Sequence, residues 1–162
     1  MKKLIIILIC SFSINTYSQE ITTYYLIRHA EKDRKDISDS NPALTAQGQK
    51  RAERWSEIFK HINFDAVYST DYRRTISTAK PTADARQLEI QFYNPRTLYS
   101  EDFKKETLGK TILVVGHSNT TPEFVNAIIG ENRYEQINDN NNANIYIVTV
   151  MNGIATSTLL SL

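Results

Sequence analysis

Two histidines and two arginines of this chain occupy positions from which they could bind and attack a phosphate group. Arg28 and His29 end an apolar, β-branched segment, and His117 follows a second such segment that ends at Gly116. Arg74 lies between them in the sequence, at the start of a predicted helix. An imidazole nitrogen is a nucleophile towards phosphorus, and guanidinium groups hold phosphate oxygens through several fixed donors. These residue types indicate phosphoryl transfer.

The positions of the two histidines favour one shared site. A lone histidine after a strand is more often structural than catalytic. However, adjacent strand residues point to opposite faces until the strand ends, so Arg28 and His29 serve one site only where the backbone turns. The carboxyl ends of parallel strands are where an open α/β sheet builds its ligand site. His117 also directly follows an apolar predicted strand. Two histidines in the same kind of position are better explained by a shared site than by chance.

The expected division of roles follows from the same chemistry. His29 would attack phosphorus through a neutral ring nitrogen, and Arg28, Arg74 and His117 would hold the three oxygens. Neighbouring cations lower the pKa of a histidine, which would keep His29 neutral. We expect His117 to be a charged donor, although the sequence leaves open which histidine attacks.

Alternating strand and helix signals predict the elements that position these residues. We expect strands at residues 21–28, 65–69, 88–93 and 111–116, helices at 46–61, 74–86, part of 95–109 and 122–129, and a hairpin of 145–151 and 154–160. Pro81 predicts a break or kink in the second helix, and Asn152-Gly153 is a strong hairpin signal. The fold class is α/β: a three-layer α/β/α sandwich with a mainly parallel sheet and an antiparallel C-terminal hairpin at its edge.

The first 18 residues have the pattern of a secretory signal peptide. Lys2 and Lys3 precede an apolar run that reaches about Ile14, and small residues at Thr16 and Ser18 suit cleavage before Gln19. The run is shorter than the roughly 20 residues of a membrane span, and a buried first strand is the less favoured alternative. We therefore expect a signal peptide over residues 1–18, one domain over 19–162, a secreted or periplasmic location and no stable membrane anchor.

Composition and motifs exclude several other functions. The chain has 19 Lys and Arg against 18 Asp and Glu, without the clustered basic excess of a nucleic-acid-binding protein. It has no Gly-x-x-x-x-Gly-Lys phosphate loop and no His, Cys or carboxylate cluster with zinc spacing. We expect no metal and no cofactor, and we interpret His61 as a helix-end residue.

Four motifs, spread over residues 24–121, resemble those of the histidine phosphatase superfamily. Arg28-His29-Ala30 is similar to the family's Arg-His-Gly, and residues 44–48 match its Leu-Thr-x-x-Gly. Residues 69–79 follow its Ser-x-x-x-x-Arg-Ala-x-x-Thr-Ala pattern, and Gly116-His117 matches its late Gly-His pair. The resemblance implies a phosphohistidine on His29, and it makes Arg74, rather than Arg73, the second catalytic arginine.

The resemblance also implies the class of substrate. It predicts a metal-independent hydrolase of phosphomonoesters or phosphoramidates, acting on a phosphorylated small molecule, a glycan or a protein phosphohistidine. The short chain is closer in size to the phosphohistidine phosphatase branch, and to periplasmic phosphatases of lipopolysaccharide core heptose phosphate, than to phytases. The oligomeric state stays open.

The chain departs from the family pattern at two positions, and it lacks an evident general acid. Ala30 adds a methyl where the backbone would approach phosphate, and Thr75 replaces the usual alanine. No carboxylate holds a secure general-acid position: Glu101 and Glu123 are candidates, with a solvated surface role as the alternative for each. A non-catalytic phosphate-binding protein of the same fold is therefore the rival interpretation.

The segment after His117 supplies further candidates. Ser118 and Asn119 precede a predicted helix, and backbone N–H groups at a helix start bind anions. We expect both residues to bind substrate.

Overall fold

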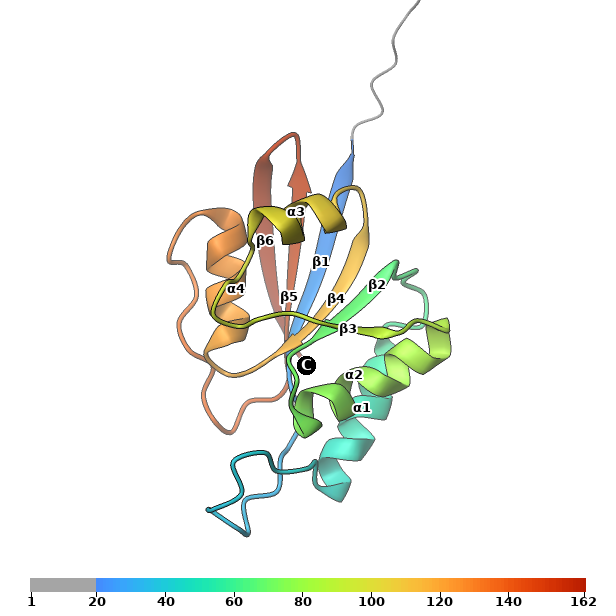
Figure 1. Cartoon of the computed structure of the whole chain (residues 1–162), viewed down its shortest axis with the longest axis vertical. Helices are drawn as coiled ribbons and strands as arrows, with labels where there is room; N and C mark the ends of the chain where they lie inside the picture. The colour runs from blue at the N-terminus through green and yellow to red at the C-terminus, as the bar shows by residue number, and fades with distance from the viewer. Residues whose placement is uncertain (1–19) are drawn as a thin grey trace, which may run out of the picture.

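The computed structural model describes residues 20–162, which form one six-stranded sheet flanked by four helices (Figure 1). In chain order the elements are β1 (Ile21–Arg28), α1 (Ala46–Ile58), β2 (Ala66–Ser69), α2 (Arg73–Arg86), β3 (Ile90–Phe92), α3 (Glu101–Thr107), β4 (Thr111–Gly116), α4 (Thr120–Ile129), β5 (Asn144–Met151) and β6 (Ile154–Ser161). The predicted signal peptide lies outside the described residues.

The sheet is mostly parallel. Its strand order is β3-β2-β4-β1-β5-β6, in which β3, β2, β4 and β1 run parallel and the β5-β6 hairpin is antiparallel to β1. Asn152 and Gly153 both have positive φ angles, of 52° and 77°, as the tight turn of a two-residue hairpin requires. The predicted fold class, including the hairpin at the edge, is confirmed.

Two apolar layers cover the two faces of the sheet. Alternate residues of β1 point to opposite faces, so Leu26 packs with Phe103 and Phe124 of α3 and α4, whereas Ile27 packs with Trp55 and other residues of α1 and α2. Figure 1 shows α1 and α2 together on one side of the strands. Both layers include residues close to the carboxyl ends of β1 and β4, such as Leu26 and Ile27 of β1.

The helix α2 continues through Pro81, so the predicted break is wrong. Proline removes one helical hydrogen bond, but Ala79, Thr82 and Ala83 of the same helix are buried. Ser56 of α1 also donates a hydrogen bond to the Pro81 carbonyl at 3.1 Å. Packing of α2 on α1 and the sheet therefore outweighs the local cost of the proline.

The remaining helices begin and end as their sequences indicate. Ser100 caps α3 by accepting a hydrogen bond from the Phe103 N–H at 3.2 Å. The helix α4 has Pro122 in its first turn, where a missing N–H costs little, and ends at Gly130 with a φ of 73°. Within residues 20–162 no helix combines the length and the apolar character needed to cross a bilayer.

Candidate active site

The register of β1 on β4 brings the two histidines together. Arg28 pairs with Gly116 at the end of this ladder, and the His29 N–H donates to the Gly116 carbonyl at 2.9 Å. The two imidazole rings then lie with their centroids 5.5 Å apart. They line one open cavity of about 320 Å³ together with Arg28, Lys32, Tyr72, Arg74, Pro95, Ser118, Asn119, Thr120 and Asp139.

The start of α1 fixes the backbone that follows His29. Thr45 donates from its backbone N–H to the Glu31 carbonyl at 2.9 Å, and its hydroxyl caps the helix by accepting from the Gly48 N–H at 3.0 Å. A Cβ on Gly48 would collide with the same Glu31 carbonyl oxygen. The Leu-Thr-x-x-Gly motif therefore docks the start of α1 on the segment that follows His29.

The helix α2 holds the same segment from the other side. The Thr78 hydroxyl accepts from the Ala30 N–H at 2.9 Å and donates to the Arg74 carbonyl at 2.7 Å. The Ala30 side chain is completely buried against Leu44 and Ala52. Its methyl group thus packs in this apolar cluster, which explains how alanine is accommodated at this position.

His29 is held as a neutral ring with one defined free nitrogen. Its Nδ1 lies 2.7 Å from the Ala30 carbonyl oxygen, which can only accept, so Nδ1 carries the proton and Nε2 keeps its lone pair. Burial lowers the pKa of His29 to about 3, and the charges of Arg28 and Arg74 act in the same direction. At neutral pH the ring therefore presents an unprotonated Nε2, as a nucleophile requires.

His117 is also neutral in this structure. Burial lowers its pKa to about 4, helped by Arg74, Lys32 and Arg28. Burial among cations disfavours an imidazolium in the unliganded site, and the role of His117 as a charged donor to bound phosphate stays a prediction. A bound phosphate dianion would oppose this effect.

Arg74 and Arg73 point in different directions, as neighbours on a helix do. Arg74 lines the cavity, where its guanidinium lies 4.4 Å from the Tyr72 ring centroid. Its Nε and Nη1 are buried and have no hydrogen-bond partner within residues 20–162. Arg73 is exposed, with Asp39 at 4.0 Å. Arg74 therefore supplies unused donors beside His29, and Arg73 does not.

Arg28 differs from its expected role. Its Nη1 donates to the carbonyls of Asn138, Asp139 and Asn141, each at 3.0 Å, and its Nη2 pairs with the Asp139 carboxylate at 2.8 Å. Only Nε lacks a partner among the described residues. Arg28 thus chiefly anchors the 138–141 segment as a wall of the site, and at most part of its guanidinium remains for a phosphate oxygen.

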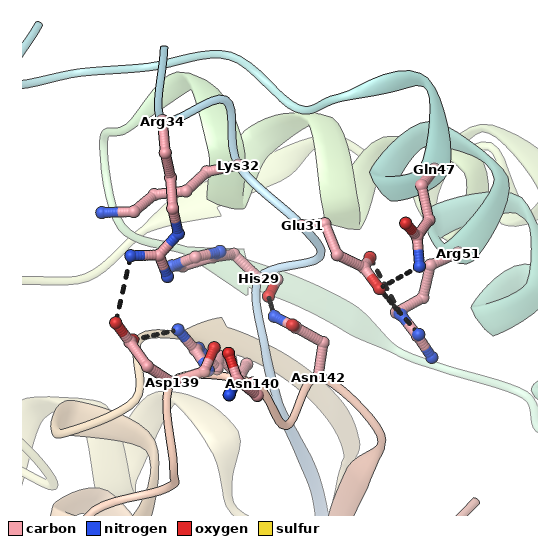
Figure 2. A pocket seen from close by; sticks show the side chains of 10 residues that line it. His29, Glu31, Lys32, Arg34, Gln47, Arg51, Asp139, Asn140 and Asn142 are labelled. Atoms are coloured by element: carbon pink, nitrogen blue, oxygen red, sulfur yellow. Dashed lines mark hydrogen bonds and ion pairs between the residues drawn. The ribbon is translucent and has the colours of Figure 1, made fainter. Parts of the chain in front are cut away.

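This wall, a loop that the sequence-based expectations did not include in the site, also borders a second hollow of about 260 Å³. Figure 2 shows Arg34 reaching Asp139 on one side of it, and Gln47 and Arg51 reaching Glu31 on the other. The hollow shares Arg28, His29, Lys32 and Asp139 with the cavity. No spacing or residue type in the sequence indicated that the loop would return to β1.

The predicted substrate-binding residues lie in the cavity wall. Ser118 and Asn119 both line it, at the start of α4. The Ser118 carbonyl accepts from the Ile137 N–H at 2.8 Å, which fixes the turn. Their placement, with the positive end of the helix dipole behind them, suits an anion.

The two predicted general acids lie elsewhere. Glu101 is highly exposed and pairs with Lys104 at 2.6 Å, and Glu123 borders a separate hollow beside Gly130. Neither lines the cavity, so the structure does not bring them to the site. Asp139 does line it, but a hydrogen bond from Arg34 and the charges of Arg34 and Arg28 lower its pKa, which keeps it ionised. Lys32 also lines the cavity, and burial, together with the charges of Arg74 and Arg34, lowers its pKa.

The described part of the chain contains no candidate metal centre. Residues 20–162 contain no group of three or more His, Cys, Asp or Glu side chains arranged to hold a metal ion.

Comparisons with known proteins agree with this geometry. Residues 24–94 match the sequence model of the histidine phosphatase superfamily (branch 1), and none of the curated protein sequences is detectably similar. Many solved structures are similar in fold, among them the following three. A putative alpha-ribazole-5'-P phosphatase from Escherichia coli is 18% identical, with 87% of this chain and 96% of that chain covered and a TM-score of 0.64.

The protein histidine phosphatase SixA, complexed with tungstate, is 17% identical, with 86% of this chain and 96% of that chain covered and a TM-score of 0.66. A phosphoserine phosphatase from Entamoeba histolytica, in complex with 3-phosphoglyceric acid, is 18% identical, with 87% and 98% covered and a TM-score of 0.66. The chain therefore carries the branch 1 sequence signature of the histidine phosphatase superfamily on a histidine phosphatase fold.

Proposed function

We propose that the protein is a phosphatase that works through a phosphohistidine on Nε2 of His29. One observation carries this proposal: His29, whose proton is held on Nδ1, lines the same cavity as Arg74, whose Nε and Nη1 have no hydrogen-bond partner within residues 20–162. The similarity in fold to SixA, whose structure holds the phosphate-like anion tungstate, supports it.

The reaction has two displacement steps. In the first, the His29 Nε2 lone pair forms a bond to phosphorus while the bond to the leaving oxygen or nitrogen breaks. Donors of Arg74, with His117 and the Ser118 turn, stabilise the charge of the transferring phosphoryl group. In the second, water attacks phosphorus, phosphate leaves, and the bonding pair returns to Nε2. The donor set supplies the positive charge that this chemistry needs, so the mechanism requires no metal.

The cavity favours leaving groups that depart easily. A general acid speeds the departure of poor leaving groups by about 10²- to 10⁴-fold, and the carboxylate that lines this cavity is ionised. Phosphoramidates such as phosphohistidine, and esters of acidic alcohols, need this help least. We include phosphorylated small molecules, glycans and protein phosphohistidine as substrate classes, with lipopolysaccharide heptose phosphate as one candidate.

Export is a separate part of the proposal. The basic pair and apolar run of the first 18 residues support a cleaved signal peptide and a periplasmic or secreted enzyme. N-terminal sequencing of the protein from fractionated native cells tests this. A chain that starts at Gln19 in the periplasm supports export, and intact Met1 in the cytoplasm contradicts it.

A non-catalytic phosphate-binding protein is the second candidate. Two observations favour it: Arg28 is largely occupied by the 138–141 wall, and no neutral carboxylic acid lines the cavity. Such a protein would bind phosphate tightly without turnover.

A screen of p-nitrophenyl phosphate, phosphohistidine and sugar phosphates separates the two functions. The phosphatase should turn over at least the first two, and labelled phosphohistidine quenched at alkaline pH should leave acid-labile label on His29. The control is His61→Asn, because His61 is exposed and distant from the cavity lining. Phosphate binding without turnover of any substrate, or acid-stable label on a serine, would overturn the proposed enzyme.

A further inference from the structure

Two threonine hydroxyls connect His117 to the helix that carries Arg74. His117 Nε2 lies 2.9 Å from Thr70 Oγ1, which in turn lies 3.0 Å from Thr75 Oγ1. The Thr75 hydroxyl is also 2.9 Å from the carbonyl oxygens of Thr70 and Tyr72. Thr70 and Thr75 are completely buried, so no bulk water competes for these bonds.

The chemistry of the end groups fixes the direction of this chain of bonds. Carbonyl oxygens only accept, so the single Thr75 proton is directed to them, and Thr75 Oγ1 accepts from Thr70. Thr70 has then used its own proton and accepts from His117 Nε2. At the other side of the ring, Arg74 Nη2 lies 3.4 Å from Nδ1, and a guanidinium only donates. Both ends therefore require a proton on Nε2 and a lone pair on Nδ1.

We propose that Thr75 is a positioning residue that, through Thr70, holds the His117 proton on Nε2 and leaves Nδ1 free against Arg74. The tautomer is a property of the resting protein, whereas its catalytic consequence rests on the proposed phosphatase function. When phosphate binds, a proton taken up by His117 goes to Nδ1, on the side of Arg74 and the cavity. His117 thereby becomes a donor to the phosphoryl group without turning its ring.

The position of Thr75 makes this arrangement a specific property of the chain. In the superfamily pattern the residue after the helix arginine is usually alanine, which has no hydroxyl. With alanine the chain of bonds would end at Thr70, whose hydroxyl could rotate either to accept from Nε2 or to donate to it. Because Thr75 accepts the Thr70 proton, Thr70 can only accept from His117 Nε2. The tautomer of His117 is thereby fixed, which contributes to preorganised electrostatic stabilisation.

Nitrogen-15 NMR of the imidazole rings tests the inference directly in the resting protein at pH 7. Wild type should show a protonated Nε2 and an unprotonated Nδ1 for His117. In Thr75→Val the two His117 shifts should move towards each other as a second tautomer becomes populated, and Thr75→Ser should restore them. The matched control is Thr82→Val, since Thr82 is a buried threonine of the same helix whose hydroxyl has no partner in the described residues.

Turnover supplies the second measurement. Thr75→Val should lower kcat on the order of 10-fold, a part of the 10²- to 10³-fold effect of losing an oxyanion donor, with a smaller change in KM. Thr75→Ser and Thr82→Val should leave kcat within about twofold. A wild-type His117 protonated on Nδ1, or a Thr75→Val protein with unchanged shifts, would overturn the inference. If the shifts behave as expected but no variant hydrolyses any phosphate compound, only the proposed function fails.

Discussion

The ends of β1 and β4 carry one histidine each, yet they fix it by different means. The His29 ring is held by the carbonyl of the next residue, Ala30, at 2.7 Å. The His117 ring is held by side chains more than 40 positions away, Thr70 and Arg74. A local contact thus orients the ring that we propose as the nucleophile, whereas long-range contacts orient the second ring.

This difference separates two functional requirements. A nucleophile needs its proton kept on the other ring nitrogen, and for His29 a bond within its own turn does this. A group that stabilises the transferring phosphoryl must respond to charge, and contacts from the segment after β2 and from α2 couple His117 to Arg74. We therefore expect the first strand end to be the more rigid and the second to be the more adjustable.

Removing each histidine in turn gives the largest contrast between the two strand ends. His29→Ala should reduce kcat for p-nitrophenyl phosphate on the order of 10⁵-fold or more, since loss of a nucleophile removes the covalent route. His117→Ala should cost on the order of 10²- to 10³-fold, because one oxyanion donor is lost. Equal losses in steady-state assays of the two variants would contradict the assigned roles.

Arg74 belongs to the adjustable end and gives the next largest effect. Arg74→Ala should lower kcat/KM by about 10²-fold, again by loss of donors to the phosphoryl group. Arg73→Ala is the matched control because Arg73 is exposed, with its side chain 61% accessible. It should change kcat/KM by less than about threefold. A larger loss in the control would mean that the helix register has been misassigned.

The sequence predicted the parts of this site that local pattern determines. The strand ends and the hairpin at Asn152-Gly153 follow from residue patterns along single elements, and the choice of Arg74 over Arg73 follows from the resemblance to the family pattern. These features depend on chemistry within a few residues, which is visible in the printed chain.

What the sequence could not predict depends on packing between distant segments. Pro81 stays helical because α2 is packed on α1, and the Ala30 methyl packs against Leu44 and Ala52. The return of Asp139 to Arg28 crosses 111 positions of sequence. None of these contacts has a periodicity, and each is decided by tertiary packing.

The pH dependence of stability should distinguish the two rings. Both have a folded-state pKa below the ordinary value of 6.5, near 3 for His29 and near 4 for His117. The unfolded chain therefore takes up these protons first, so the free energy of unfolding falls as pH drops below 6.5. For the buried His29 ring the fall is about 1.4 kcal/mol per pH unit at most.

Urea unfolding between pH 4 and 7 measures this effect. His29→Asn and His117→Asn should each be less sensitive to falling pH than wild type, and the His117 contribution should level off at the higher pH. His61→Asn is the control, because His61 is exposed. If the His29→Asn slope equals that of wild type, burial does not hold that ring neutral.

The backbone N–H groups at the two strand ends provide a smaller contrast. Thr78 accepts from the Ala30 N–H at 2.9 Å in a fully buried position, and Thr120 accepts from the His117 N–H at 3.1 Å beside the open cavity. Thr78→Val should cost about 1–3 kcal/mol of unfolding free energy, because a buried donor loses its partner. Thr120→Val should cost less, because water in the cavity can replace the hydroxyl. A smaller loss for Thr78→Val in thermal or urea unfolding would mean that the first strand end is not the more rigid.

Substitution of Asp139 should have the smallest effect on phosphate binding. It tests whether the 138–141 wall acts mainly through the charge of Asp139 or by its contact with Arg28 at the end of β1. The ionised Asp139 carboxylate lines the cavity that we assign to phosphate, so Asp139→Asn removes one like charge. A unit charge at short range in a wet site is worth roughly 1 kcal/mol, and inorganic phosphate should therefore inhibit the variant about 2- to 5-fold more strongly. Asp84→Asn, which alters an exposed aspartate paired with Lys80 on α2, is the control. The gain should shrink at high salt, since screening acts on exposed charges. If phosphate instead binds more weakly, the ion pair to Arg28 matters more for holding the 138–141 wall than for the charge of the cavity, and the end of β1 depends on distant contacts after all.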